Sequence, residues 1–382
     1  MKKHLRKAIF LTAESPYPQI GCEKQREANL IRFLHEHMMV DVLCFEPITP
    51  DAGDSDHKSR SFGQPSGVKV STIKREKSRY LGALRAPLRW LISGGYSIAM
   101  AKALKNHATD NTLLWISGTG MSGYIPLGRV LGCPVVLDAH GSATIKPLKL
   151  VGNQPDIITV ESDADAASLS KFKHKIKIRV IPDAVDCKKY EAIHTKAGTN
   201  LFFSGSLDKP ANIDGLIWFI DEILPRLRAA LGENLPQVEI ATSTLLRNIP
   251  HFIGNRLKRE DIKLHTAPKS ILPFLEKAAI VFIPIRSGSG TPMKILEAMA
   301  AGRPVVSTGH GAKNLVLSPS YDIWIANHED AFTSAILRLL ENKPLRAKVG
   351  VRAVETVRKY YNFSSVRQEI AKLLNLLFTK SV

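Results

Sequence analysis

The stretch IPIRSGSGTPMKILEAMAAGRPVVSTGHGAKNL, residues 283–315, decides the fold of this chain. It predicts a strand, a glycine-rich turn, a helix, a glycine stop, a second strand and a second glycine-rich turn, the order found where helices cross a parallel sheet. Gly288 and Gly290 would let the backbone approach a ligand closely, and Thr291 can cap the helix that follows. Exposed N–H groups at a helix start favour a diphosphate, so the segment predicts a phosphate-binding turn.

Charged side chains flank this turn. Arg286 precedes the glycines, and Lys294 lies one turn into the predicted helix, so both could neutralise phosphate charge. Glu297 follows Lys294 by three residues and shares its helix face. The same residues also fit a tight turn that needs glycine for its geometry alone, with Lys294 and Glu297 as a surface ion pair. The physical argument leaves both interpretations open.

Short apolar runs alternate with longer helical patterns along the whole chain, which is typical of parallel α/β folds. In the first half, the predicted strands are residues 8–12, 40–45, 112–116, 134–137, 156–160 and 179–181. In the second half, they are residues 200–203, 237–241, 262–265, 280–283, 304–307 and 322–325.

The strand pattern restarts after a polar segment, residues 187–199, which we interpret as a linker. A chain of 382 residues also suits two domains rather than one core. We therefore expect two Rossmann-like α/β domains, residues 1–190, joined by a C-terminal helix at 363–382, and residues 191–362.

Composition bounds the class of protein. Hydrophobic residues make up 44% and charged residues 23% of the chain, as in ordinary globular proteins. The four cysteines form no CxxC pair or metal-ligand spacing, which argues against a disulfide framework and a zinc site and favours a reducing cytoplasm. The apolar run near the N-terminus is too short for a signal peptide, and no stretch has the length of a membrane span.

The formal net charge of +18 indicates a polyanionic partner. Residues 68–106 hold nine basic residues against one acid, and their leucines recur near helical spacing beside Trp90. Two interpretations stay open for this segment: a solvated basic face over a leucine stripe, and contact with an anionic membrane surface. Nucleic acid is not an expected partner, because no nucleic-acid-binding motif accompanies the charge.

Five segments, taken together and in order, resemble the GT-B glycosyltransferases, most closely the retaining family 4 or group 1 type. They are SPYPQIGCEKQREANLIRFL (15–34), PVVLDAH (134–140), VIPDAVD (180–186), FSGSLDKPANIDGLIWFI (203–220) and the stretch 283–315. The resemblance implies two Rossmann-like domains facing across a cleft. The acceptor would approach from the N-terminal domain, and the nucleotide sugar would bind the C-terminal domain without a bound cofactor or metal.

The resemblance assigns roles residue by residue. His140 matches a cleft histidine that contacts the donor sugar, and Asp138 lies two residues before it on the same side of an extended strand. Gly21 would let the backbone approach the donor phosphates, and Gly311 lies in a turn that wraps the donor. Lys269, in the segment TAPKS, lies in the loop that would hold the nucleobase through main-chain groups.

Two departures from the family pattern concern the donor. Glu297 matches the second acid of an E-x7-E motif, whose role is a hydrogen bond to the donor ribose, but the first acid falls at Ser289. The basic pair of a G-R-x4-K motif, which binds phosphate, falls at Ser206 and Ala211.

Basic residues near this loop are the expected replacements for the missing pair. They are Lys209, Arg286 and Lys294. Ser206 stays in the expected donor site, and His140, Lys294 and Asp138 are the expected catalytic residues.

These features predict a hexosyltransferase that moves a sugar, with retention, from UDP-hexose or GDP-hexose to a lipid-linked or polysaccharide acceptor in cell-envelope polysaccharide synthesis. We expect it in the cytoplasm or on the inner face of the cytoplasmic membrane. The missing acid and basic pair keep open a non-catalytic GT-B module that binds a nucleotide sugar or assembles other transferases, and a nucleotide-sugar epimerase is a third alternative.

Overall fold

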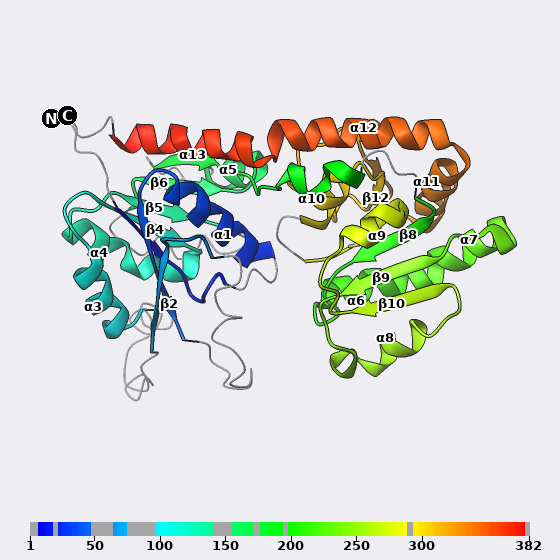
Figure 1. Ribbon diagram of the computed structural model, residues 1–382, viewed down its shortest axis with the longest axis horizontal. Helices are drawn as coiled ribbons and strands as arrows, with labels where there is room; N and C mark the ends of the chain where they lie inside the picture. The colour runs from blue at the N-terminus through cyan, green and yellow to red at the C-terminus, as the bar shows by residue number, and fades with distance from the viewer. Residues whose placement is uncertain are drawn as a thin grey trace. The chain divides into compact units, whose positions relative to one another are not determined.

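The computed structural model divides the chain into two compact units, Met1–Pro182 with Val366–Val382 (unit 1) and Asp183–Ser365 (unit 2). The residues that the structure describes are 7–17, 22–46, 64–74, 96–140, 154–170, 176–193, 198–288 and 293–378. Each unit is an α/β fold around one parallel sheet (Figure 1). The predicted fold class is confirmed.

Unit 1 holds a seven-stranded parallel sheet. Its strands are β1 Lys7–Leu11, β2 Met39–Phe45, β3 Lys69–Ile73, β4 Thr112–Ser117, β5 Val135–Asp138, β6 Ile157–Val160 and β7 Lys177–Val180. Their spatial order is β3-β2-β1-β4-β5-β6-β7, so the direction of winding reverses between β1 and β4. In open parallel sheets, ligands bind at the carboxyl ends of the strands beside such a reversal.

Helices cover both faces of this sheet. One face packs against α3 Ile98–His107, the 3-10 helix η3 Thr119–Tyr124, α4 Ile125–Val130 and α5 Asp163–Ser170. Another helix, α1 Cys22–His35, buries Ile31, Phe33 and Leu34. The last helix, α13 Phe363–Phe378, lies beside α1, since Arg367 pairs with Glu36 and its guanidinium lies 5.8 Å from the centre of the Phe33 ring.

Unit 2 holds a six-stranded parallel sheet. Its strands are β8 Asn200–Ser204, β9 Val238–Thr242, β10 Ile262–Thr266, β11 Ala278–Ile283, β12 Val305–Ser307 and β13 Trp324–Ile325. The order is β10-β9-β8-β11-β12-β13, with the reversal between β8 and β11. The two glycine-rich turns of the stretch 283–315 therefore follow β11 and β12, at the carboxyl edge of the sheet.

Alternating side chains of these strands build two hydrophobic clusters. Phe203 and Phe282 face one cluster, and Phe202 and Val281 face the other. The first cluster is covered by α6 Pro210–Trp218, α7 Leu224–Leu231, α8 His251–Arg256 and α11 Glu329–Glu341. The second is covered by the 3-10 helix η6 Cys187–Ile193, α9 Leu272–Lys277, α10 Met293–Ala300 and α12 Lys343–Tyr360.

Helices α6 and α7 are joined by one π-helical turn, Phe219–Ile223. Pro225 lies at the start of α7 and has no backbone N–H, so it cannot donate the regular bond to the preceding turn. A π turn accommodates this gap without ending the helix. The long helix can therefore bury Trp218, Phe219 and Ile223 in one continuous stripe.

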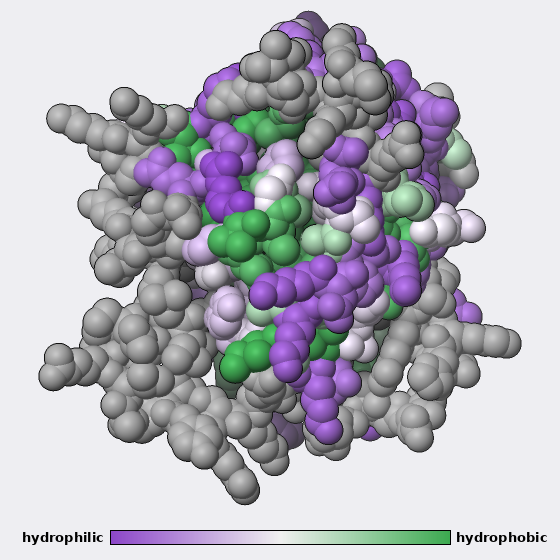
Figure 2. Space-filling view, turned by 90° about the vertical axis from the view of Figure 1, so that its left-hand side faces the viewer, coloured by the Kyte–Doolittle hydropathy of each residue, from purple (hydrophilic) through white to green (hydrophobic). Residues whose placement is uncertain are grey.

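Among the described residues, no helix combines the length and the apolar character needed to cross a bilayer. Residues 75–95 of the basic segment lie outside the described residues, as does the predicted leucine stripe. The face of the molecule in Figure 2 shows hydrophilic side chains beside smaller hydrophobic areas. Membrane contact through residues 68–106 thus stays a prediction from the sequence.

Candidate functional site

A cluster of polar side chains forms at the carboxyl edge of the unit 1 sheet. We call Thr12, Glu27, Ser117 and His140 the histidine cluster; they come from the ends of β1 and β4, from α1 and from the residues after β5. The hydroxyls of Thr12 and Ser117 donate to the same oxygen, Glu27 Oε1, at 2.6 and 2.7 Å. Ser117 Oγ also lies 3.2 Å from His140 Nε2. The cluster lies where the strand order reverses.

Glu27 is an unusual carboxyl group because it is only 7% exposed. Burial raises its pKa, and the hydrogen bonds from Thr12 and Ser117 offset part of this rise. His140 itself is half-buried in unit 1.

A buried ion pair supports the backbone next to this cluster. Arg26 Nε and Nη2 donate to the two oxygens of Asp138 at 3.0 and 2.7 Å, and Arg26 Nη1 donates to Ile181 O at 2.9 Å. Thr159 Oγ1 adds a bond to Asp138 Oδ1 at 2.6 Å. Burial alone would raise the pKa of Asp138, but the Arg26 guanidinium holds it below its ordinary value.

Asp138 was expected as a catalytic residue, yet its side chain has no exposed surface. Its oxygens bond to Arg26 and Thr159 inside the unit. We therefore assign Asp138 a positioning role at the end of β5, two residues before His140, rather than contact with a ligand.

A second cluster forms at the carboxyl edge of the unit 2 sheet, around Lys294. Lys294 Nζ donates to Asn212 Oδ1 at 2.8 Å and lies 4.7 Å from the centre of the Phe203 ring. A Cβ atom built at Gly205 would lie 2.8 Å from Lys294 Nζ. Asn212 Nδ2 in turn donates to Ser206 O at 2.8 Å. The structure thus places the Lys294 ammonium on the loop after β8, where the family's basic pair is missing.

The other two basic candidates lie differently. Lys209 is exposed at the residue before α6. Arg286 pairs with Asp214 at 3.0 Å and lies over the Trp218 ring at 5.2 Å. Of the three expected replacements, Lys294 is the one whose charged group contacts the loop.

Ser206 is held within the same loop. Its hydroxyl donates to Asp208 Oδ1 at 2.5 Å and lies 3.1 Å from Thr244 Oγ1. The Thr244 hydroxyl also accepts from the Leu207 N–H at 2.8 Å. These bonds hold the backbone of the loop in place, and Lys294 Nζ approaches the loop at Gly205.

The two glycine-rich turns are bonded to each other. Gly288 has a φ of 101°, which favours glycine, and its carbonyl oxygen accepts from His310 Nε2 at 2.9 Å. At Gly311, an added Cβ would lie 2.8 Å from Ser307 Oγ, so the turn after β12 needs glycine for its close packing. Four expected donor-site residues lie outside the described residues: Gly21, Ser289, Gly290 and Thr291.

Glu297 is half-buried on α10, one turn after Lys294. Tyr190 donates to Glu297 Oε1 at 3.3 Å. Burial raises the pKa of Glu297 to about 7, although Tyr190, Lys189 and Lys294 oppose the rise. Lys269, the expected nucleobase-loop residue, is exposed in the loop after β10.

The raised pKa of Glu297 predicts a pH dependence of stability. An acid whose pKa is higher in the folded state stabilises the fold below its unfolded pKa and loses that contribution as the pH rises through the folded pKa. We expect the wild type to lose stability between about pH 5 and pH 8 more steeply than Glu297→Gln. Urea unfolding across that range measures this loss, and parallel curves for the two proteins would contradict a raised pKa of Glu297 in the folded state.

Sequence reasoning missed five residues around these clusters: Thr12, Arg26, Glu27, Ser117 and Asn212. A usable signal existed for Glu27, which shares a helix face with Leu30, Ile31 and Leu34 at the spacing of a buried stripe. A charged residue on such a face requires a buried partner.

The chain has a cavity of about 870 Å³ at the opposite, amino-terminal edge of the unit 2 sheet. The three arginines that line it already bond within the unit: Arg303 donates to Ile193 O, Arg346 to Leu339 O and Leu340 O, and Arg358 to Glu191. Ligands of parallel sheets bind at the carboxyl edge, so we place the candidate site there and not in this cavity. Within the described ranges, no group of histidine, cysteine or acidic side chains could hold a metal ion.

Comparison with known proteins points to one family. Residues 198–342 match the family described as glycosyl transferases group 1. A UDP-Gal:alpha-D-GlcNAc-diphosphoundecaprenol alpha-1,3-galactosyltransferase of Escherichia coli is 24% identical over 340 residues, covering 81% of this chain and 82% of that protein. An uncharacterized 44.6 kDa protein in the cps region of Klebsiella pneumoniae is 26% identical over 182 residues, and the match spans only 45% of either chain.

Solved structures share the fold over the whole chain. Sucrose-phosphate synthase from Thermosynechococcus elongatus has a TM-score of 0.72 at 14% identity, covering 98% of this chain and 100% of that chain. The HepE protein of Anabaena, solved with UDP and glucose, has a TM-score of 0.71 at 14% identity, covering 97% and 99%. The second unit thus matches the group 1 glycosyltransferases over residues 198–342, and the whole chain has the GT-B fold of two Rossmann-like domains.

Proposed function

We propose that this glycosyltransferase moves a hexose from a UDP-sugar to a lipid-linked saccharide during cell-envelope polysaccharide synthesis. One observation carries the proposal: the Lys294 ammonium lies against Gly205 at the carboxyl edge of the sheet, with its contacts to Asn212 and Phe203 holding it there. A fixed cation beside a glycine backbone suits a diphosphate leaving group. The E. coli relative, named for a UDP-Gal donor and a diphosphoundecaprenol acceptor, supports the choice of substrates.

The proposed roles follow the chemistry of each side chain. Lys294 neutralises the charge that develops on the departing diphosphate, and Glu297 accepts a hydrogen bond from a donor hydroxyl such as that of the ribose. His140 contacts the sugar, as the family resemblance implies. The acceptor hydroxyl attacks the anomeric carbon on the face from which the diphosphate leaves, so the configuration is retained without a protein nucleophile.

A transfer assay tests this proposal. Purified full-length protein is incubated with radiolabelled UDP-galactose, UDP-glucose or a GDP-hexose and with an N-acetylglucosaminyl diphosphate lipid. We expect labelled lipid product with one of the UDP-sugars and an α linkage by proton NMR. Product from the GDP-sugar alone, or binding of UDP-sugar with neither transfer nor hydrolysis, would overturn the proposal, the latter in favour of a non-catalytic module.

Gly205→Ala provides a sharper test of the lysine position. The added methyl would lie 2.8 Å from the flexible end of Lys294 and 3.0 Å from both Asn212 Nδ2 and Phe203 Cζ, so the ammonium moves and the two neighbouring side chains shift by a few tenths of an ångström. We expect UDP affinity to fall about tenfold, equivalent to about 1.4 kcal/mol, and urea unfolding of the variant shows how much of the change comes from the fold. Calorimetric titration measures the affinity, and unchanged UDP binding would contradict the proposed role of this loop.

We also propose contact with an anionic membrane surface through residues 68–106, because a lipid-linked acceptor lies there and the segment is strongly basic. Cosedimentation with phosphatidylglycerol vesicles tests it. We expect binding at low salt that weakens at high salt and is absent with phosphatidylcholine vesicles. Equal binding to both vesicles, or none to either, would contradict it.

A further inference from the structure

The histidine cluster contains a buried carboxyl group, Glu27, that the proposed mechanism does not use. Glu27 contacts no ligand in that mechanism, and its side chain is almost completely buried and is linked to His140 through the Ser117 hydroxyl. Both hydroxyls that reach it, from Thr12 and Ser117, come from strands on either side of the reversal of the unit 1 sheet. Glu27 therefore lies where the strand order reverses between β1 and β4, and Ser117 connects it to the imidazole of His140.

The direction of the hydrogen bonds in this cluster is fixed by the number of protons available. A serine hydroxyl carries one proton, and the Ser117 hydroxyl donates this proton in its hydrogen bond to Glu27 Oε1 at 2.7 Å. Ser117 Oγ can therefore only accept from His140 Nε2, which lies 3.2 Å away. A neutral imidazole has one N–H, so this bond places the proton on Nε2 and leaves a lone pair on Nδ1.

The ring is also held from its side and through its backbone. A Cβ atom at Gly118 would lie 3.5 Å from His140 Cε1, so the imidazole packs directly over this glycine. Gly118 N–H donates to Asp138 O at 2.9 Å, and Ala139 N–H donates to Thr159 O at 2.8 Å. Within the described ranges no residue bonds Nδ1, and the ring bond to Ser117 uses Nε2.

We infer that Glu27 is a positioning residue that acts through Ser117 to hold His140 as the Nε2–H tautomer, with Nδ1 presented as a hydrogen-bond acceptor. The inferred ligand group is a hydroxyl, because a lone pair on a neutral imidazole accepts from O–H donors and repels carbonyl or phosphate oxygens. The role of Nδ1 toward a sugar hydroxyl rests on the proposed function. The assignment of the tautomer is independent of the proposed function.

The first test is spectroscopic and needs no ligand. Full-length protein labelled with nitrogen-15 histidine is studied by long-range proton–nitrogen correlation at a pH where the imidazole is neutral, and the His140→Gln variant identifies the His140 signals. We expect the pattern of the Nε2–H tautomer alone in the wild type. A Nδ1–H pattern, or a mixture of the two tautomers, would overturn the inference whatever the transfer assay shows.

The second test asks whether Ser117 and Glu27 act through His140. We expect Ser117→Ala to lower UDP-sugar turnover about tenfold in the wild-type background and to have no further effect in the His140→Gln background. Glu27→Met should behave in the same way, whereas Glu27→Gln, which keeps an acceptor oxygen, should retain most activity. Additive losses in the two backgrounds would overturn the inference, because a merely structural role does not depend on the imidazole.

Circular dichroism and unfolding curves accompany each variant. Ser117→Ala removes only one hydroxyl, so it remains informative if the bulkier change at Glu27 disturbs folding. If wild-type protein shows the Nε2–H tautomer but no turnover of any nucleotide sugar, the proposed function fails while the positioning inference stands.

Discussion

Lys294→Met is expected to lower kcat/KM for sugar transfer by about 10²–10³-fold, equivalent to about 3–4 kcal/mol. The structure brings the Lys294 ammonium beside Gly205 in the loop after β8, where it donates to Asn212 in the first turn of α6 at 2.8 Å. Methionine keeps most of the side-chain volume over the Phe203 ring but cannot stabilise charge on a departing diphosphate. Steady-state kinetics with the UDP-sugar accepted by the wild type measure the effect.

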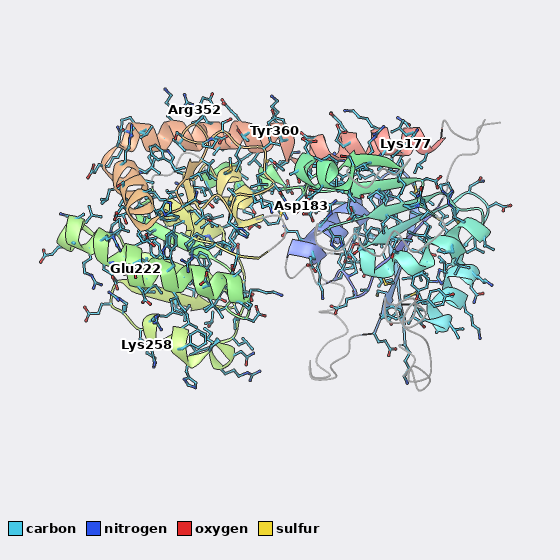
Figure 3. The ribbon with its side chains drawn as sticks, turned by 180° about the vertical axis from the view of Figure 1, so that it is seen from behind. Lys177, Asp183, Glu222, Lys258, Arg352 and Tyr360 are labelled. Atoms are coloured by element: carbon cyan, nitrogen blue, oxygen red, sulfur yellow. The ribbon has the colours of Figure 1, made fainter. Side chains whose placement is uncertain are left out.

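Lys258→Met is the matched control for this variant. Lys258 is exposed after α8, far along the chain from both glycine-rich turns, and it is labelled in Figure 3. The same change of charge there should leave kcat/KM unchanged. If Lys294→Met and Lys258→Met had equal activity, a phosphate role for Lys294 would be excluded and its contact with Asn212 would be purely structural.

Arg26→Met is expected to destabilise unit 1 by about 3–5 kcal/mol, because it leaves the Asp138 carboxylate buried without its partner. Asp138 has no exposed surface and, among the residues that the structure describes, keeps the bond from Thr159. Urea unfolding followed by circular dichroism measures the loss. The control is Lys372→Met, which breaks an exposed pair with Glu369 and should cost less than about 1 kcal/mol.

The sign of the pH dependence adds a second check on this pair. The folded pKa of Asp138 is lowered, so its contribution to stability is present at neutral pH and is lost as the pH falls through that lowered pKa. The difference between wild type and Arg26→Met should therefore shrink in strong acid. Adding Asp138→Asn to Arg26→Met should recover part of the stability at neutral pH; a further loss would contradict an uncompensated charge as the cause.

The strands could be predicted from the sequence wherever they are buried on both faces. All twelve predicted strands occur, with ends shifted by at most two residues. The missed strand is β3, whose sequence KVSTI is polar and only partly buried at the edge of its sheet, so it carries no apolar run. The π turn before α7 could not be predicted either, since Pro225 alone does not determine whether a helix bends, ends or continues.

Some residues of the candidate site could likewise be predicted from the sequence, and others could not. Lys294, Glu297 and the glycines lie in one continuous stretch, so local spacing predicts that they share a helix and its preceding turn. Arg26 and Glu27 could not be assigned locally, because their partners Asp138 and Ser117 lie 112 and 90 residues away in the chain. Only the strand order of unit 1 brings these residues together.

The central claim, that this chain uses a UDP-sugar, is tested most directly by a thermal-shift comparison of UDP, GDP and ADP with wild type and Lys294→Met. A ligand that binds only the folded state stabilises it by about 2.7 kcal/mol at a hundredfold excess over its Kd. We predict that UDP raises the Tm of the wild type, that GDP and ADP do so much less, and that Lys294→Met loses most of the UDP shift. No shift with UDP in folded wild-type protein, or a larger shift with GDP or ADP, would contradict the account.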